Sequence, residues 1–222
     1  MGRNTKDSLG SEILTTVDTY DAVANQYRER TLKEGDRRFQ ERMLSDTLEM
    51  LPSSPTILDL GCGDGRDTSF LDERDIHVTG LDLSKSMINL ARQLFPDCKF
   101  VRGNMAKTPF ADDTFDCVWS SASMIHFPKK DLSKVEKEIH RILKRNGLLV
   151  FSFKEGIDEG YESGTYGRKR YYSYYTLAEL EEMLTFFHIL TFRRYPEEIM
   201  GNRFVYCWLE LKKTNRGNIR HR

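Results

Sequence analysis

The sequence lacks several features that would assign it to a special class of protein. Its four cysteines contain no C-x-x-C pair, which argues against a zinc ribbon or a dithiol redox motif. Lys plus Arg and Asp plus Glu both number 34, so no net charge attracts nucleic acid or an anionic membrane. No apolar run approaches the ~18 residues that span a bilayer, and residues 1–10 are too polar for a signal peptide. We therefore expect a cytoplasmic protein with reduced thiols and no membrane partner.

Length and composition favour one globular domain. The 222 residues are 39% hydrophobic and 31% charged, which suffices to bury a core without disulfides or metal ions. We expect residues 1–51 to form an N-terminal helical cap and residues 52–213 to form the main core of the same domain. The basic residues 214–222 are expected to form a disordered tail.

Hydrophobic periodicity predicts an α/β fold. Apolar residues recur at helical spacing through residues 11–51, and Pro52 and Pro55 end that pattern. Strands are then expected at residues 56–60, 76–81, 99–102, 115–120 and 147–153, with helices at 67–73, 84–95 and 131–144. Such alternation predicts a parallel sheet connected by crossover helices.

The last third of the chain has a different pattern. Residues 154–175 are rich in glycine and tyrosine and are predicted to form a long functional loop. A helix is expected at residues 177–186. The β-prone stretches 188–195 and 204–211 then predict a closing antiparallel hairpin.

The turn after the first strand carries the strongest functional signal. The strand ends in Gly61-Cys62-Gly63-Asp64-Gly65, and Asp82 follows the next strand about 20 residues on, as in nucleotide-binding α/β sheets. A dinucleotide fingerprint requires glycine where Arg66 stands. Asp59 and Asp64 would repel a diphosphate and suit a cationic ligand. A nicotinamide-dependent oxidoreductase is therefore disfavoured.

Five segments in order resemble the motifs of the class I S-adenosylmethionine-dependent methyltransferases, and the likeness extends over residues 20–212. The segments are residues 57–67, 78–92, 103–109, 115–127 and 139–153. The resemblance implies a doubly wound, seven-stranded, mostly parallel sheet with an antiparallel last strand and helices on both faces. It also implies S-adenosylmethionine as cofactor, S-adenosylhomocysteine as product, and no metal.

The resemblance further implies cofactor-binding residues. These are Asp59, Gly61, Cys62 and Gly63 at the methionyl part, Asp82 at the ribose, Leu83, Met87, Asn104 and Met105 around adenine, and Ser120 and Ser121 beside the methionine moiety. Asn104 stands where the family usually has aspartate, but its amide oxygen can accept the same hydrogen bond. Each residue also has a simpler structural explanation: the glycines could only form a turn, and Asp82 could only cap the next helix.

Catalytic and acceptor-binding residues are predicted around the cofactor. Tyr20 and Tyr27 lie seven residues apart on one helical face and resemble a family lid, although both could simply belong to the core. His126 is a candidate general base, with local hydrogen bonding as the alternative. The residues expected to contact the acceptor are Lys154, Arg170, Tyr171, Tyr172 and Tyr175.

The resulting prediction is an enzyme, monomeric or homodimeric, that transfers a methyl group to a nitrogen or oxygen atom of a small molecule. Neither an Asn-Pro-Pro-aromatic signature nor a cytosine-type cysteine nucleophile is found. One alternative is a tRNA-modifying methyltransferase, because Arg170-Tyr171-Tyr172 and the following Leu177 and Glu179 faintly resemble wobble-uridine enzymes. Another alternative is a regulatory protein that binds the cofactor without catalysis.

Overall fold

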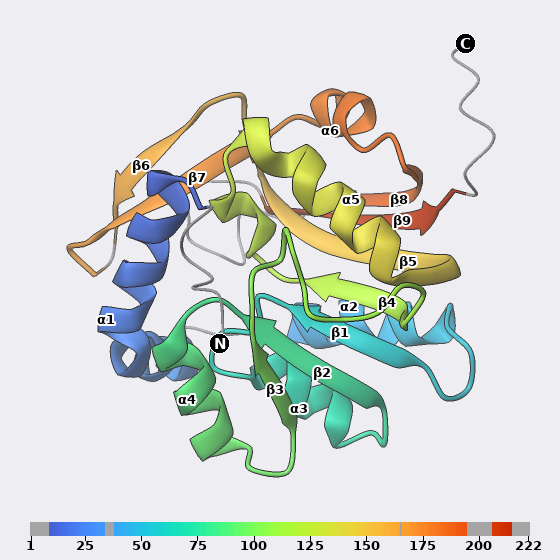
Figure 1. The fold of residues 1–222 in the computed structure, drawn as a ribbon, viewed down its shortest axis with the longest axis horizontal. Helices are drawn as coiled ribbons and strands as arrows, with labels where there is room; N and C mark the ends of the chain where they lie inside the picture. Colours follow the sequence, from blue (N-terminus) through green and yellow to red (C-terminus); the bar gives the residue numbers. More distant parts are fainter. Residues whose placement is uncertain (1–8, 34–37, 165, 195–205, 215–222) are drawn as a thin grey trace.

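The computed structural model describes residues 9–33, 38–164, 166–194 and 206–214 (Figure 1). The helices are α1 (Ser11–Lys33), α2 (Arg38–Glu49), α3 (Arg66–Asp72), α4 (Lys85–Leu94), α5 (Leu132–Ile142) and α6 (Leu177–Met183). The strands are β1 (Thr56–Leu60), β2 (His77–Asp82), β3 (Lys99–Arg102), β4 (Phe115–Ser120), β5 (Leu143–Glu155), β6 (Glu159–Ser163), β7 (Lys169–Tyr175), β8 (Phe187–Arg194) and β9 (Tyr206–Lys213). Except for Thr214, the predicted tail lies outside the described residues.

Seven strands form the sheet that the sequence predicted. Their order is β3-β2-β1-β4-β5-β9-β8, and β9 runs antiparallel to both of its neighbours. The other neighbouring pairs, from β3 to β5, are parallel, as crossover helices require. The predicted seven-stranded, mostly parallel sheet with an antiparallel last strand is confirmed.

Helices cover both faces of this sheet (Figure 1). On one face, α2 and α3 pack against Trp119 and Trp208, whose rings stack with their centroids 4.5 Å apart. On the other face, α5 and α6 bury their apolar sides, including Ile139 and Leu180. The alternating apolar positions of the helices and the near-continuous apolar strands explain this layering. The predicted cap is therefore divided: α2 packs on the sheet, and only α1 lies at its edge.

The prediction of a long loop at residues 154–175 is wrong, because these residues form a hairpin of β6 and β7. The two strands pair antiparallel, with Tyr161 opposite Tyr171, and Gly167 returns a backbone hydrogen bond to Gly164 in the turn. Tyrosines favour the pleated, half-buried surface of a strand. The end of β7 continues the parallel sheet beside the last residues of β5, which places the hairpin at the sheet's carboxyl edge.

Helix boundaries follow local chemistry. Ser84 caps α4 as predicted, because its hydroxyl accepts the amide of Met87 at 3.1 Å. The predicted helix 131–144 ends two residues early at Ile142, because Leu143 already pairs with Phe115 as part of β5. Within the described ranges, no helix is long and apolar enough to cross a membrane.

Candidate functional site

A cavity of about 240 Å³ lies where the carboxyl ends of the strands meet α1. Figure 1 shows α1 beside α4 and the β6–β7 hairpin, and the contacts of α1 with α4 and β7 agree. The cavity wall consists of Ile13, Thr16, Val17, Tyr20, Tyr27, Gly61, Gly63, Leu81, Asp82, Leu83, Met87, Gly103, Met105, Ser121, Ala122, Ser123, Ile125, His126, Phe127, Arg170 and Tyr172. This is the edge at which open α/β sheets bind ligands.

Two glycines of the first β/α turn face different surroundings. Gly61 has a φ of 81°, and a Cβ atom there would lie 2.2 Å from Cβ of Ser123. Gly63 has a φ of 55°, and a Cβ atom there would meet nothing within 4 Å. Gly61 therefore allows two chain segments to pack closely, whereas Gly63 leaves space through which a ligand can approach the backbone.

Asp82 holds the same turn from the end of β2. Its Oδ2 accepts the amide of Gly63 at 3.0 Å, and its Oδ1 accepts the amide of Ser84 at 2.8 Å. Burial raises the pKa of Asp82, and these amide donors oppose the shift. A carboxylate oxygen can accept a second hydrogen bond, so both oxygens can still bind the two hydroxyls of a ribose.

The apolar part of the wall is suited to a flat ring. Leu83, Met87 and Met105, the residues predicted to surround adenine, line the cavity together with Asp82. Open backbone space at Gly63, a carboxylate for a ribose and an apolar slot for a base together fit S-adenosylmethionine. The residues present therefore match the cofactor that the resemblance implies.

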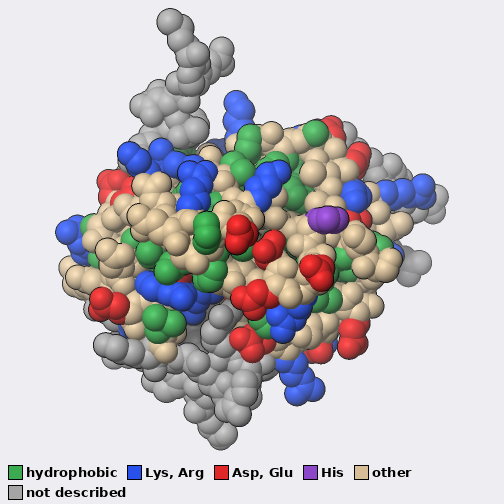
Figure 2. All heavy atoms as spheres, turned by 90° about the horizontal axis from the view of Figure 1, so that it is seen from below, with side chains coloured by type: hydrophobic (Ala, Val, Ile, Leu, Met, Phe, Trp, Pro, Cys, Tyr) green, Lys and Arg blue, Asp and Glu red, His purple; other side chains and the backbone are tan. Residues whose placement is uncertain are grey.

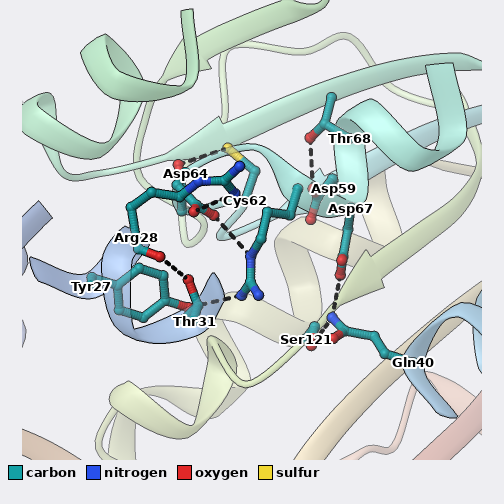
Figure 3. A network of polar contacts seen from close by, with 12 residues as sticks. Tyr27, Arg28, Thr31, Gln40, Asp59, Cys62, Asp64, Asp67, Thr68 and Ser121 are labelled. Atoms are coloured by element: carbon teal, nitrogen blue, oxygen red, sulfur yellow. Dashed lines mark hydrogen bonds and ion pairs between the residues drawn. The ribbon is translucent and has the colours of Figure 1, made fainter. Parts of the chain in front are cut away.

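The carboxylates of Asp59 and Asp64 are held inside the protein and do not line the cavity. Asp64 lies 3.2 Å from both Arg28 of α1 and Arg66 of α3, so its charge is neutralised within the fold (Figure 3). Asp59 accepts the hydroxyl of Thr68 at 2.6 Å, and burial raises the pKa of its carboxyl. Spacing alone does not predict these partners, because Arg28 lies on α1 and Arg66 and Thr68 lie on α3.

Three other predicted cofactor residues also lie off the cavity wall. Cys62 is buried, which raises the pKa of its thiol. The side-chain oxygen of Asn104 accepts the amide of Ala106 at 2.9 Å, and the hydroxyl of Ser120 lies 2.5 Å from that of Ser123. By contrast, Ser121 lines the cavity, and its hydroxyl accepts a hydrogen bond from Gln40 of α2 at 3.0 Å (Figure 3).

The three predicted catalytic residues all line the cavity, and Tyr20 contacts both of the others. The hydroxyl of Tyr20 lies 2.9 Å from Nε2 of His126, and the ring of Tyr20 meets that of Tyr27 edge-on at 5.8 Å between centroids. Arg170 donates a hydrogen bond to the same Tyr20 hydroxyl at 3.2 Å. A chain of side chains therefore connects α1 to β7 across the cavity.

The hydrogen bonds of His126 define its tautomer. Its Nδ1 lies 2.7 Å from the carbonyl oxygen of Tyr171, which can only accept, so Nδ1 carries the proton. Nε2 is then an acceptor, and the hydroxyl of Tyr20 donates to it. Burial and the nearby charge of Arg170 lower the pKa of His126 to about 3, so the imidazole is neutral at physiological pH.

Only two of the predicted acceptor contacts, Arg170 and Tyr172, line the cavity. Lys154 lies behind this wall, with its Nζ 3.8 Å from the ring centroid of Tyr172. Tyr171 contributes its backbone carbonyl to His126, and its side chain lies off the wall, as does that of Tyr175. Alternation along β7 explains the split, since neighbouring residues of a strand point to opposite faces.

Several residues of the cavity wall were missed by the sequence analysis. Ile13, Thr16 and Val17 precede Tyr20 on α1 at helical spacing, so the face shared with Tyr20 was the available signal. Ile125 and Phe127 flank His126 in a short 3₁₀ turn, which no periodicity predicts. Among the described residues, no group of three or more metal-binding side chains could hold an ion.

Polar side chains of α1 attach this helix to the elements on which it lies over the cavity. Asp21 accepts the hydroxyl of Ser84 at 2.6 Å and the amide of Ser86 at 2.9 Å, so it caps the first turn of α4. Arg28 adds the ion pair with Asp64 of the glycine turn. The helix that covers the cavity is therefore attached to both segments that form the cofactor side of its wall.

Comparison with known proteins agrees with this architecture. Residues 57–147 match a family described as "Methyltransferase domain". The chain is 32% identical over 136 residues to demethylmenaquinone methyltransferase of Thermotoga maritima, covering 59% of this chain and 58% of that protein. It is 35% identical over 107 residues to 2-methyl-6-phytyl-1,4-hydroquinone methyltransferase of Synechocystis, covering 46% of this chain and 33% of that protein. The chain thus spans less than two thirds of these relatives.

The fold is also found among solved structures. The 1,6-didemethyltoxoflavin-N1-methyltransferase of Burkholderia thailandensis, with its substrate and S-adenosylhomocysteine bound, superposes with a TM-score of 0.73. The two chains are 21% identical, and the match covers 95% of this chain and 93% of the other. The chain therefore has the fold of this methyltransferase, and its residues 57–147 match the methyltransferase family.

Proposed function

We propose that the protein transfers a methyl group from S-adenosylmethionine to a nitrogen or oxygen atom of a small molecule. One observation carries this proposal: a single cavity is lined by Gly63 and Asp82 of the family-matched core and by Tyr20, His126 and Arg170 from three other elements. The cavity thus joins a cofactor side to a second, chemically different side. That division suits an enzyme that brings two ligands together.

The residues of the cavity divide the work of this reaction. When bound, the cofactor supplies a methyl group on a sulfonium; the acceptor atom bonds to the methyl carbon as the sulfur–methyl bond breaks, leaving S-adenosylhomocysteine. Asp82 would bind the ribose, Leu83 and Met87 the adenine, and Gly63 would admit the methionyl part. Residues of α1 would exclude water and hold the acceptor in line.

We assign His126 and Tyr20 a positioning role. The neutral imidazole accepts a hydrogen bond from the Tyr20 hydroxyl, and Arg170 donates a hydrogen bond to the oxygen of that hydroxyl. Both hydrogen-bonding directions of the phenol are therefore fixed, which orients Tyr20 at the boundary between the two sides of the cavity. A histidine with a pKa lowered to about 3 is a poor general base near neutral pH.

The size of the site supports a small acceptor. The cavity is lined by residues of α1 and β7, and Figure 2 shows basic and acidic side chains interspersed on one face of the molecule. The tRNA alternative relied partly on Arg170, but this side chain lines the cavity and bonds to Tyr20. The compounds named for two similar proteins, 2-methyl-6-phytyl-1,4-hydroquinone and 1,6-didemethyltoxoflavin, are also small molecules.

Cofactor binding and turnover test this proposal together. Calorimetry with S-adenosylhomocysteine should detect binding to the purified chain, and a labelled methyl donor should transfer label to material in a metabolite extract. A protein that binds S-adenosylhomocysteine but labels nothing would support the regulatory alternative. A protein that neither binds S-adenosylhomocysteine nor transfers label would contradict the proposed function.

Asp82→Ala should abolish cofactor binding, because the variant removes both oxygens proposed to bind the ribose. Calorimetry should show at least a tenfold weaker affinity for S-adenosylhomocysteine, or about 1.4 kcal/mol, while circular dichroism shows a retained fold. Asp82→Asn keeps one oxygen acceptor and should lose less affinity. The exposed Asp97→Ala is the matched control. Wild-type affinity in Asp82→Ala would contradict our placement of the ribose.

A further inference from the structure

Arg170 lies at the end of the cavity opposite the predicted adenine slot. The slot residues follow β2 and β3, whereas Arg170 belongs to β7, which pairs with the last two residues of β5, two strands beyond β1 on the other side. The glycine turn after β1 lies between these ends. Arg170 is therefore assigned to the side of the cavity that the cofactor does not fill.

The guanidinium of Arg170 is held among aromatic rings and has unused donors. Its central carbon lies 5.6 Å from the ring centroid of Tyr20 and 5.2 Å from that of Tyr172. One nitrogen donates to the Tyr20 hydroxyl, while Nε is buried without a hydrogen-bond partner among the described residues. A buried donor without a partner costs folding free energy. The guanidinium of Arg170 is therefore suited to donate to an acceptor atom of a bound ligand.

No carboxylate in the described part of the chain forms an ion pair with Arg170. Asp82 is the acid on the cavity wall, and the amides of Gly63 and Ser84 already bind it. Lys154 adds a second cation nearby, partly balanced by Glu162 at 3.9 Å, and its burial together with the charge of Arg170 lowers the pKa of the amine to about 8. His126 is neutral. Among the described residues, the guanidinium of Arg170 therefore has no carboxylate partner that would compete with an incoming anion.

We propose, as a refinement that rests on the methyltransferase function above, that the acceptor is a small organic acid. Its anionic oxygen, a carboxylate or an acidic phenolate, binds the guanidinium of Arg170 between Tyr20 and Tyr172. The rest of the acceptor lies against the apolar wall of Ile13, Val17 and Ile125. A planar anion satisfies the fork of the guanidinium, and an aromatic or aliphatic body fits the surrounding side chains.

Fractionation of acceptors tests the charge directly. A metabolite extract is separated by anion exchange at pH 6 and at pH 9, and each fraction is incubated with the full chain and labelled S-adenosylmethionine. We expect label only with retained fractions: a carboxylate is retained at both pH values, and a phenolate only at pH 9. Label confined to the unretained fraction would overturn the proposal, while leaving the methyltransferase function standing.

Variants test the role of Arg170 independently. Arg170→Gln should lower transfer at limiting acceptor at least tenfold, while the dissociation constant of S-adenosylhomocysteine stays within twofold. Arg170→Lys keeps the positive charge but loses the forked guanidinium. Its rate of transfer should therefore lie between those of the wild type and Arg170→Gln. The exposed Arg168→Gln, two residues away on the chain, is the matched control and should behave as wild type.

The outcomes separate the two proposals. A tenfold weaker affinity of Arg170→Gln for S-adenosylhomocysteine would show that the guanidinium binds the cofactor instead, and would overturn the anionic acceptor. Absence of both cofactor binding and labelling in the wild type would instead contradict the proposed function. If Arg170→Gln does not fold, Arg170→Lys and the fractionation still decide the question.

Discussion

At the scale of single residues, two glycines of one turn have separate roles. Gly61 touches Ser123, whose hydroxyl donates to the carbonyl of Leu60 at 2.6 Å, so the turn and the end of β4 are packed together. Gly63 donates its amide to Asp82, and a Cβ atom at this position would meet nothing within 4 Å. The first glycine therefore belongs to the stability of the fold, and the second to its binding surface.

Substituting each glycine by alanine should separate these roles. Gly61→Ala forces its Cβ atom into Ser123 and should cost at least ~2 kcal/mol of unfolding free energy. Gly63→Ala has room, so only its positive φ costs about 1 kcal/mol. That variant should instead bind S-adenosylhomocysteine about tenfold more weakly. Thermal denaturation and calorimetry measure both effects; a stable Gly61→Ala beside an unfolded Gly63→Ala would contradict this assignment.

At the scale of elements, the sequence predicted those parts that depend on local pattern. Strands β1, β3 and β4 begin and end where apolar runs indicated, and Ser84 caps α4. The β6–β7 hairpin was missed, because its pairing depends on distant contacts with β5 and α1 that composition does not reveal. The candidate site shows the same limit: Gly63 and Asp82 could be found by spacing, whereas Thr16 and Arg170 meet them only through the fold.

The packing of α5 predicts a pH dependence of stability. Glu136 is 1% exposed and accepts the amide of Phe186 at 2.7 Å, and burial raises its pKa to about 7. Because the unfolded chain has a pKa near ~4.3 at this group, the native state binds more protons between these values. Stability should therefore fall as pH rises from about 4.5 to 7.

Glu136→Gln should remove this loss, because an amide stays neutral and its oxygen can still accept the Phe186 amide. We expect a stabilisation of about 1 kcal/mol above pH 7, seen as a rise of ~2–4 °C in melting temperature. The exposed Glu181→Gln serves as control. Equal pH profiles for wild type and Glu136→Gln would show that this carboxyl does not govern the effect.

At the scale of the whole molecule, charge is balanced in number and interspersed on the face seen in Figure 2. Three cations in the described part of the chain have internal positions: Arg28 and Arg66 bind Asp64, and Arg170 lines the cavity. Arg168 and Lys169, by contrast, are exposed. On this face the acidic side chains would weaken the attraction between the basic ones and a polyanion. The molecule is therefore organised around an internal site.

Binding of tRNA should consequently be weak and only slightly sensitive to salt. Filter binding at 50 and 200 mM KCl should give a slope of log K against log salt no steeper than about −2, since each phosphate contact adds about −0.9. A slope near −6 would indicate an extended phosphate-binding surface. That result would favour the RNA-modifying alternative.

Asp21 connects α1, which covers the cavity, to the start of α4, and so links access to the cavity with the structure of its wall. The same carboxylate accepts the hydroxyl of Ser84 and the amide of Ser86 at the start of α4, soon after Asp82. Any opening that releases Asp21 therefore removes these two hydrogen bonds beside the position proposed for the ribose. Cofactor entry and product release would then follow one opening equilibrium, in which α1 separates from α4 and the start of α4 loosens at the same time.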